Sequence, residues 1–188
     1  MGLGSISLII IIITIVYFII IYNKFISLRA GINASESDID VQLKRRYNLI
    51  PALIDTVKGY QKHETETLEK VVKARQHSMQ ANSMEEKSKA ANMLSNALGK
   101  VFALAESYPD LKANTNFLKL QQELSSIEDT IQNARRYYNA IARDYNAKLD
   151  SFPDLLVARN FNFTSRNYFE LDENEAETVR NMPKVNFS

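Results

Sequence analysis

The sequence predicts an all-α protein in which an N-terminal transmembrane helix is followed by an elongated, up-and-down four-helix bundle. Three observations predict this fold class. An uncharged, isoleucine-rich run lies near the N-terminus, and apolar residues recur in steps of three and four along much of the remaining chain. The 188 residues also include only five glycines and four prolines. Because these two residues have the lowest helix propensities, their scarcity favours long helices.

The predicted anchor is the run from Ser5 to Tyr22, which contains no charged residue. As a helix it would span ~27 Å, close to the thickness of the hydrocarbon core of a bilayer. A cleaved signal peptide is the alternative. It fits less well, because no basic residue precedes the run and Asn23-Lys24-Phe25 after it is not a small-residue cleavage site. We therefore expect residues 1–4 to be a short external N-terminus and residues 5–22 to cross the membrane once.

The charges beside the span predict its orientation. Lys24 and Arg29 follow the apolar run, whereas no Lys or Arg precedes it. By the positive-inside rule, basic residues beside a membrane span remain on the cytoplasmic side. The rule therefore predicts that the N-terminus is outside the cell membrane and the bundle in the cytoplasm.

Residues 23–152 are predicted to form the bundle. The first helical stripe contains Phe25, Leu28, Ile32, Ile39 and Leu43, and the second contains Ile50, Leu53, Ile54, Val57, Leu68, Val71 and Val72. A capping box from Ser83 to Glu86 opens the third helix, Pro109-Asp110 ends it, and its stripe is Ala90, Leu94, Ala97, Val101, Leu104 and Tyr108. The fourth helix has the most regular coiled-coil-like seam: Phe117, Leu120, Leu124, Ile127, Ile131, Ala134, Tyr138, Ile141 and Tyr145.

The region around Pro51 allows two topologies. In the preferred one the chain folds back at Asn48, Pro51 lies in the first turn of a second helix that runs to Met79, and the fourth helix returns to the membrane. In the other, the first two helices form one long, kinked helix, because the apolar phase continues from Leu43 through Val57. We expect the fourth helix to end far from the membrane in that case.

Residues 153–188 form a predicted aromatic and acidic tail. Its aromatic residues are Phe161, Phe163, Tyr168 and Phe169, and its acidic residues include Glu170, Asp172, Glu173, Glu175 and Glu177. The preferred interpretation is a tail that packs along the bundle, because aromatic side chains more often fill cores. The alternative, which requires the fold-back, is a segment at the lipid headgroups.

Composition excludes several functional classes. The chain has no cysteine, which excludes disulfides, thiolate metal sites and cysteine nucleophiles. A net charge of +1 argues against nucleic acid as a partner, and the glycines are too dispersed for a phosphate-binding loop. His63 and His77 would lie ~21 Å apart along a helix, too far to share a metal ion. We expect no enzymatic activity and no cofactor.

Two polar clusters stand out on the predicted helices. They are Lys44-Arg45-Arg46 and Arg135-Arg136-Tyr137-Tyr138-Asn139. The first cluster would lie ~35 Å from the membrane, too far for anionic lipid, so we expect it to pair with acidic groups of a neighbouring helix or to form a contact patch at the tip. Arginine and tyrosine side chains at the edge of a helical seam need partners, so the second cluster predicts a polar network between helices. A ligand pocket is the alternative.

Several motifs along the chain resemble those of the LemA family of bacterial membrane proteins. They are Asp40–Pro51, Val57–Tyr60, His63-Glu64, Tyr108–Asn114, Ala134–Asn139, Asp144–Asn146, Phe152-Pro153, Tyr168–Glu170 and Pro183–Phe187. The resemblance implies a membrane helix followed by a cytoplasmic four-helix bundle, and it implies no established activity. We take as candidate interaction or polar-network residues Gln42, Lys44, Arg45, Arg46, Lys58, Tyr60, His63, Arg135, Arg136, Tyr137, Tyr138, Asn139, Tyr145 and Asn146.

Two functional hypotheses follow. The first is a non-enzymatic scaffold, anchored in the lipid bilayer, that binds proteins not identified by the sequence and that self-associates as a homo-oligomer. Anchoring favours such assembly, because it raises the effective concentration of the bundles. The second is a ligand-sensing or accessory subunit of a membrane protease or transporter.

Overall fold

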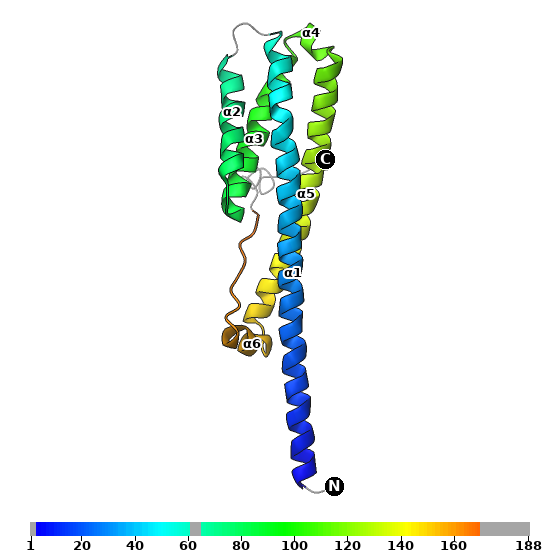
Figure 1. Cartoon of the computed structure of the whole chain (residues 1–188), viewed down its shortest axis with the longest axis vertical. Helices are drawn as coiled ribbons and strands as arrows, with labels where there is room; N and C mark the ends of the chain where they lie inside the picture. The colour runs from blue at the N-terminus through cyan, green and yellow to red at the C-terminus, as the bar shows by residue number, and fades with distance from the viewer. Residues whose placement is uncertain (1–2, 61–64, 170–188) are drawn as a thin grey trace, which may run out of the picture. The chain divides into compact units, whose positions relative to one another are not determined.

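The structure, a computed structural model, describes residues 3–60 and 65–169. These residues form helices joined by turns, followed by an extended segment, and no strand occurs among them (Figure 1). The predicted all-α class is confirmed. The helices are α1 (Leu3–Lys58), α2 (Thr65–Gln80), α3 (Met84–Ala105), α4 (Pro109–Lys112), α5 (Thr115–Asp150) and α6 (Asp154–Asn160).

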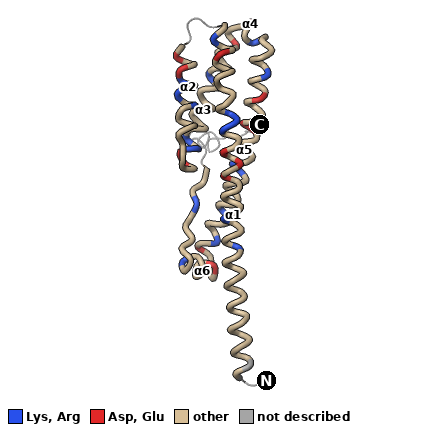
Figure 2. Tube along the Cα trace, viewed as in Figure 1, with Lys and Arg blue, Asp and Glu red and all other residues tan. Residues whose placement is uncertain are grey.

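The N-terminal part of α1 is the predicted anchor. Figure 2 shows no Lys, Arg, Asp or Glu along this part of the helix, and its isoleucine side chains are exposed except that of Ile21, which is buried. Within the described residues, α1 is the one helix that is long and apolar enough to cross a membrane. Exposed isoleucines are expected where lipid, rather than protein, surrounds a helix.

The preferred fold-back at Asn48 is wrong, because α1 continues without interruption to Lys58 with Pro51 inside it. Proline has no backbone N–H, so the carbonyl four residues earlier loses its usual helical partner. That carbonyl belongs to Tyr47, and Nε of Arg75 in α2 donates a hydrogen bond to it at 2.9 Å. A side chain from a neighbouring helix thus replaces the bond that proline removes, so α1 does not end there.

We expect Arg75→Met to lower the free energy of unfolding by about 1.5–3 kcal/mol, the range for a hydrogen bond from a charged donor. In a Pro51→Ala background the cost is expected to be smaller, because the introduced alanine would supply the backbone N–H that the carbonyl of Tyr47 lacks. Denaturant unfolding of the natural chain, the two single variants and the double variant, followed by circular dichroism, measures this coupling. Equal costs in the two backgrounds would contradict the proposed role of Arg75.

The described residues fall into two compact units. The anchor unit comprises α1 up to Asp38 together with Arg136–Tyr168. In it, the ring of Phe25 lies 5.8 Å from that of Tyr145, and a Cβ on Gly31 would lie 3.5 Å from Ile141. The two helices are therefore antiparallel, and α5 returns to the anchor even though α1 does not fold back. The expectation that a continuous first helix leaves the fourth far from the membrane is wrong, because the chain reverses after Lys58 instead.

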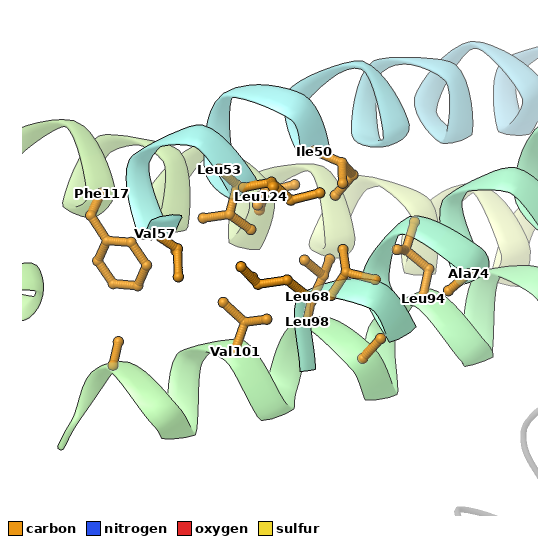
Figure 3. Packing of buried hydrophobic residues seen from close by; sticks show 14 of the residues in the cluster. Ile50, Leu53, Val57, Leu68, Ala74, Leu94, Leu98, Val101, Phe117 and Leu124 are labelled. Carbon is orange, nitrogen blue, oxygen red and sulfur yellow. The ribbon is translucent and has the colours of Figure 1, made fainter. Parts of the chain in front are cut away.

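Among the described residues, the bundle unit comprises those of Ile39–Arg135 together with Phe169. Its hydrophobic core is built by the C-terminal part of α1, by α2, α3 and the first part of α5, whose side chains point toward one another (Figure 3). The predicted stripes supply this core, including Ile50, Leu53, Leu94 and Phe117. Val72 is an exception, since it is exposed on the outer side of α2.

The helix ends follow local signals. The predicted capping box is confirmed: Ser83 Oγ accepts from the N–H of Glu86, whose carboxylate accepts from Ser83 N and Asn82 N. These backbone donors hold the pKa of Glu86 below its usual value. The third helix ends at Ala105, earlier than predicted, and Pro109 instead opens the short helix α4. Asn114 Oδ1 then accepts from the backbone N–H groups of Asn116 and Phe117 at the start of α5.

Candidate functional site

A buried ion pair links three helices of the bundle unit. Arg46 of α1 is only 3% exposed, and its Nη2 lies 2.8 Å from Oε2 of Glu128 in α5. The same guanidinium donates to Ser95 Oγ at 2.7 Å and to the carbonyl of Ala91 at 3.4 Å, both in α3. Because a buried guanidinium needs acceptors, these contacts hold α1, α3 and α5 in one arrangement.

A second arginine lies beside this pair. Burial lowers the pKa of Arg46, Glu128 opposes that shift, and the charge of Arg135 adds to it. Arg135 is itself buried, and its guanidinium lies over the ring of Phe169 at 4.4 Å. Cation–π attraction of this kind holds Phe169 of the tail against the bundle unit.

An aromatic cluster dominates the anchor unit. Phe25 stacks on Phe163 at 4.8 Å and meets the edge of Tyr145 at 5.8 Å. Tyr22 lies 4.7 Å from Phe161 and 5.9 Å from Phe163. The rings therefore connect the end of the apolar span, the C-terminal part of α5 and the segment after α6.

Charged groups border this cluster. The guanidinium of Arg29 lies 5.6 Å from the centre of the Phe163 ring. Burial raises the pKa of Tyr145, while the charges of Arg166 and Arg29 partly oppose the shift. The phenol is therefore neutral at physiological pH and acts through packing.

Polar side chains of α5 hold the extended segment after α6. Asn146 Oδ1 accepts from the N–H of Arg166 at 2.9 Å, and its Nδ2 donates to the carbonyl of the same residue at 2.9 Å. Tyr138, which is buried, donates its hydroxyl to the carbonyl of Asn167 at 2.8 Å. An extended backbone has no hydrogen bonds of its own, so these contacts replace the water that it would otherwise bind.

The predicted site residues do not form one site. Tyr138, Tyr145 and Asn146 act in the anchor unit, whereas Arg46 and Arg135 act in the bundle unit. Asn139 is half-buried, and the exposed candidates are Lys44, Arg45, Lys58, Tyr60, Arg136 and Tyr137. Tyr60 accepts from Asn114 Nδ2 at 2.8 Å, and Gln42 accepts from Arg45 within α1. His63 lies outside the described residues.

The sequence predicted acidic partners on a neighbouring helix for the Lys44-Arg45-Arg46 cluster, but it did not identify the partner residues. Glu128 and Ser95 complete the Arg46 contacts, and the backbone of Arg166 and Asn167 meets α5. Glu128 directly follows Ile127 of the predicted seam. This position is at the edge of the seam, where a carboxylate can pair with a buried cation of a neighbouring helix. The backbone groups of Arg166 and Asn167 could not be predicted as partners of α5, because nearly every residue carries the same N–H and C=O groups.

The described part of the tail is packed at some positions and exposed at others. Its interpretation as a segment at the lipid headgroups stays a prediction. Phe169 is buried in the bundle unit and Phe163 is half-buried in the anchor unit, as a packing tail requires. Phe161 and Tyr168 remain exposed. The acidic stretch from Glu170 onward lies outside the described residues.

One open groove is described on the bundle unit. A groove of about 360 Å³ lies at the α2–α3 turn and is lined by His77, Gln80, Ala81, Asn82, Glu86, Lys89, Ala90 and Met93. Within the described residues, no group of three or more His, Cys, Asp and Glu side chains could hold a metal ion. The described residues therefore offer exposed surfaces for binding and polar contacts between helices.

Comparison with known proteins identifies the family. The model of the LemA family matches residues 35–187. The protein LemA of Metamycoplasma hominis is 30% identical, over 84% of this chain and 72% of its own length. The magnetosome proteins MamQ 2 of Paramagnetospirillum magneticum and MamQ of Magnetospirillum gryphiswaldense are 23% and 24% identical, over 79% of this chain. This chain spans 64% of the length of each of these two.

None of these names states an enzymatic activity. With its apolar N-terminal helix, the protein is a membrane-associated helical protein. The family model covers most of the chain, and the motifs that resemble the family lie largely within the matched range. The chain belongs to the LemA family.

Proposed function

We propose that this protein is a non-enzymatic scaffold, anchored in the cell membrane by α1, that binds proteins, including further copies of itself, through the outer faces of α2 and α3. The observation that carries the proposal is the exposure of large apolar side chains there. Met79 of α2 is 53% exposed and Met93 of α3 is 50% exposed, and Val72 is also exposed. Methionine suits such a surface, because its flexible side chain adapts to different partners.

The internal polar groups support interaction rather than chemistry. The guanidinium of Arg46 is surrounded by Glu128, Ser95 and the carbonyl of Ala91, so this charge stabilises the helices. The surface near Met93 also carries Glu86 and Lys89. Apolar side chains beside charges of both signs are typical of the core and rim of protein interfaces.

The proposal places the bundle unit in the cytoplasm. Lys24 and Arg29 are the first basic residues after the apolar run, and both are exposed. The positive-inside rule favours the cytoplasm for that side of the membrane. Because the natural chain has no cysteine, one introduced cysteine reports both the contact and the side of the membrane.

We expect full-length Met93→Cys, expressed in intact bacterial cells, to form crosslinked dimers with a membrane-permeant bismaleimide, several-fold more than the exposed control Val41→Cys. An impermeant bismaleimide should give none until the cells are lysed. Crosslinking by the impermeant reagent in intact cells would overturn the orientation alone.

Self-association has a second measurement. Size-exclusion chromatography with light scattering should show a detergent-stable particle larger than one chain, and Met79→Glu with Met93→Glu should reduce it. A strict monomer at micromolar concentration, together with no crosslinking at Met93→Cys by either reagent, would contradict self-assembly.

A further inference from the structure

Large apolar side chains are exposed around the short helix α6. Phe152 is 81% exposed, Leu156 is 49% exposed and Phe161 is 52% exposed. The opposite side of α6 is packed, since Val157 and Ala158 are buried. Single exposed apolar residues are common on protein surfaces, but three within so short a segment indicate a surface that another apolar phase covers.

The position of this segment indicates that the covering phase is the lipid bilayer. The ring of Phe161 lies 4.7 Å from the ring of Tyr22, and both belong to the anchor unit. Tyr22 is the last residue of the predicted span, two residues before the first charge at Lys24, so its ring marks the end of the span. Phe161 therefore lies at the depth where the hydrocarbon gives way to lipid headgroups, which is where aromatic side chains accumulate in membrane proteins.

The charges of the segment suit the same place. Lys24 and Arg159 are exposed, and their long side chains can reach phosphate groups while their stems stay in the apolar layer. Asp154, at the start of α6, would oppose a negatively charged surface. Its Oδ1 is 3.0 Å from the ammonium of Lys148 and its side chain is mostly buried, so its charge is compensated.

We propose that α6, with Phe152, Leu156 and Phe161, is a second membrane contact that inserts into the headgroup layer of the bilayer that α1 crosses. The proposal rests on the membrane anchor and is independent of the scaffold function. A transmembrane helix alone can rotate about its own axis in the bilayer. A second contact at α6 removes that freedom and so presents a constant side of the anchor unit to the membrane.

The test is a depth measurement on the full-length chain. Single-cysteine variants Phe152→Cys, Leu156→Cys and Phe161→Cys carry an environment-sensitive nitrobenzoxadiazole label. Each is placed as one chain per nanodisc of phosphatidylcholine and phosphatidylglycerol, which removes a second copy as an alternative occupant. Lipids with a nitroxide near the headgroup then quench labels that lie in the interface.

Tyr137→Cys is the matched control, because Tyr137 is exposed on α5 of the same unit. It lies eight residues before Tyr145, ~12 Å along the helix from the ring that meets Phe25. We expect at least three-fold stronger quenching at positions 152, 156 and 161 than at 137. Quenching at the control level at 152 and 156 overturns the proposal, whatever position 161 shows, since α6 itself must then be in water. Circular dichroism and thermal unfolding of each labelled variant establish that the fold is retained.

Discussion

Replacing Glu128 with leucine is expected to lower the free energy of unfolding of the bundle unit by about 3–5 kcal/mol, the range for removing one partner of a buried ion pair. The substitution leaves the guanidinium of Arg46, which is 3% exposed, without its counter-charge and beside the charge of Arg135. Denaturant unfolding of the full-length chain in detergent, followed by circular dichroism, measures the loss.

The reverse substitution is expected to cost less. Arg46→Met leaves Glu128 without its counter-charge, but 27% of that side chain is exposed, so Glu128 is closer to water than Arg46 is, although its Oε2 is buried. We expect a loss of about 1–2 kcal/mol, mainly from the hydrogen bonds to Ser95 and Ala91. The double variant should recover most of the stability lost by Glu128→Leu, because a buried ion pair and an apolar pair of similar size often contribute comparably. A larger loss for Arg46→Met than for Glu128→Leu would contradict this account.

Phe25→Ala is expected to lower the free energy of unfolding of the anchor unit by about 3–5 kcal/mol, the usual cost of truncating a buried phenylalanine. Phe25 is fully buried, stacks on Phe163 and meets the edge of Tyr145. Its loss leaves a cavity between α1, α5 and the extended segment. Hydrogen exchange should therefore speed up at residues 161–168 as well as in α5, while the core of the bundle unit keeps its protection.

Phe152→Ala is the matched control for that experiment. The same atoms are removed, but Phe152 is largely exposed, so little intramolecular packing is lost. We expect its free energy of unfolding in detergent to stay within about 0.5 kcal/mol of the natural chain. If the two variants lose equal stability, packing of Phe25 against the returning tail does not hold the anchor unit together.

Much of the architecture could be predicted because its signals are local. The uncharged run, the seam of α5 and the Ser83 capping box each lie within one helix or at its end, and all three appear in the structure as predicted. The seam residues Phe117, Leu124, Ile131, Tyr138 and Tyr145 are buried. Helical periodicity indicates which side of a helix is buried. The spacing of apolar residues within the segment is enough to identify that side.

The errors arose where the outcome depended on residues far apart in the sequence. A proline in an otherwise continuous apolar pattern allows either a break or a continuous helix. At Pro51 the helix continues, and Arg75, which is distant in the sequence, donates to the carbonyl of Tyr47. The tail was likewise judged as one segment. In the structure, Phe163 stacks on Phe25 and Phe169 packs against Arg135, whereas Phe161 is exposed beside Tyr22.

The sequence by itself determined that this protein is all-α, that its first helix is apolar enough to span a membrane, and which side of each long helix is buried. Tertiary structure alone decided where the chain reverses, that Glu128 neutralises Arg46, and that Asn146 holds the backbone of Arg166. The physical reason is that the spacing of apolar residues that marks the buried side of a helix is set by residues close together in the sequence. The partner of a buried charge or an unpaired carbonyl depends instead on which distant residue the fold brings within about 3 Å.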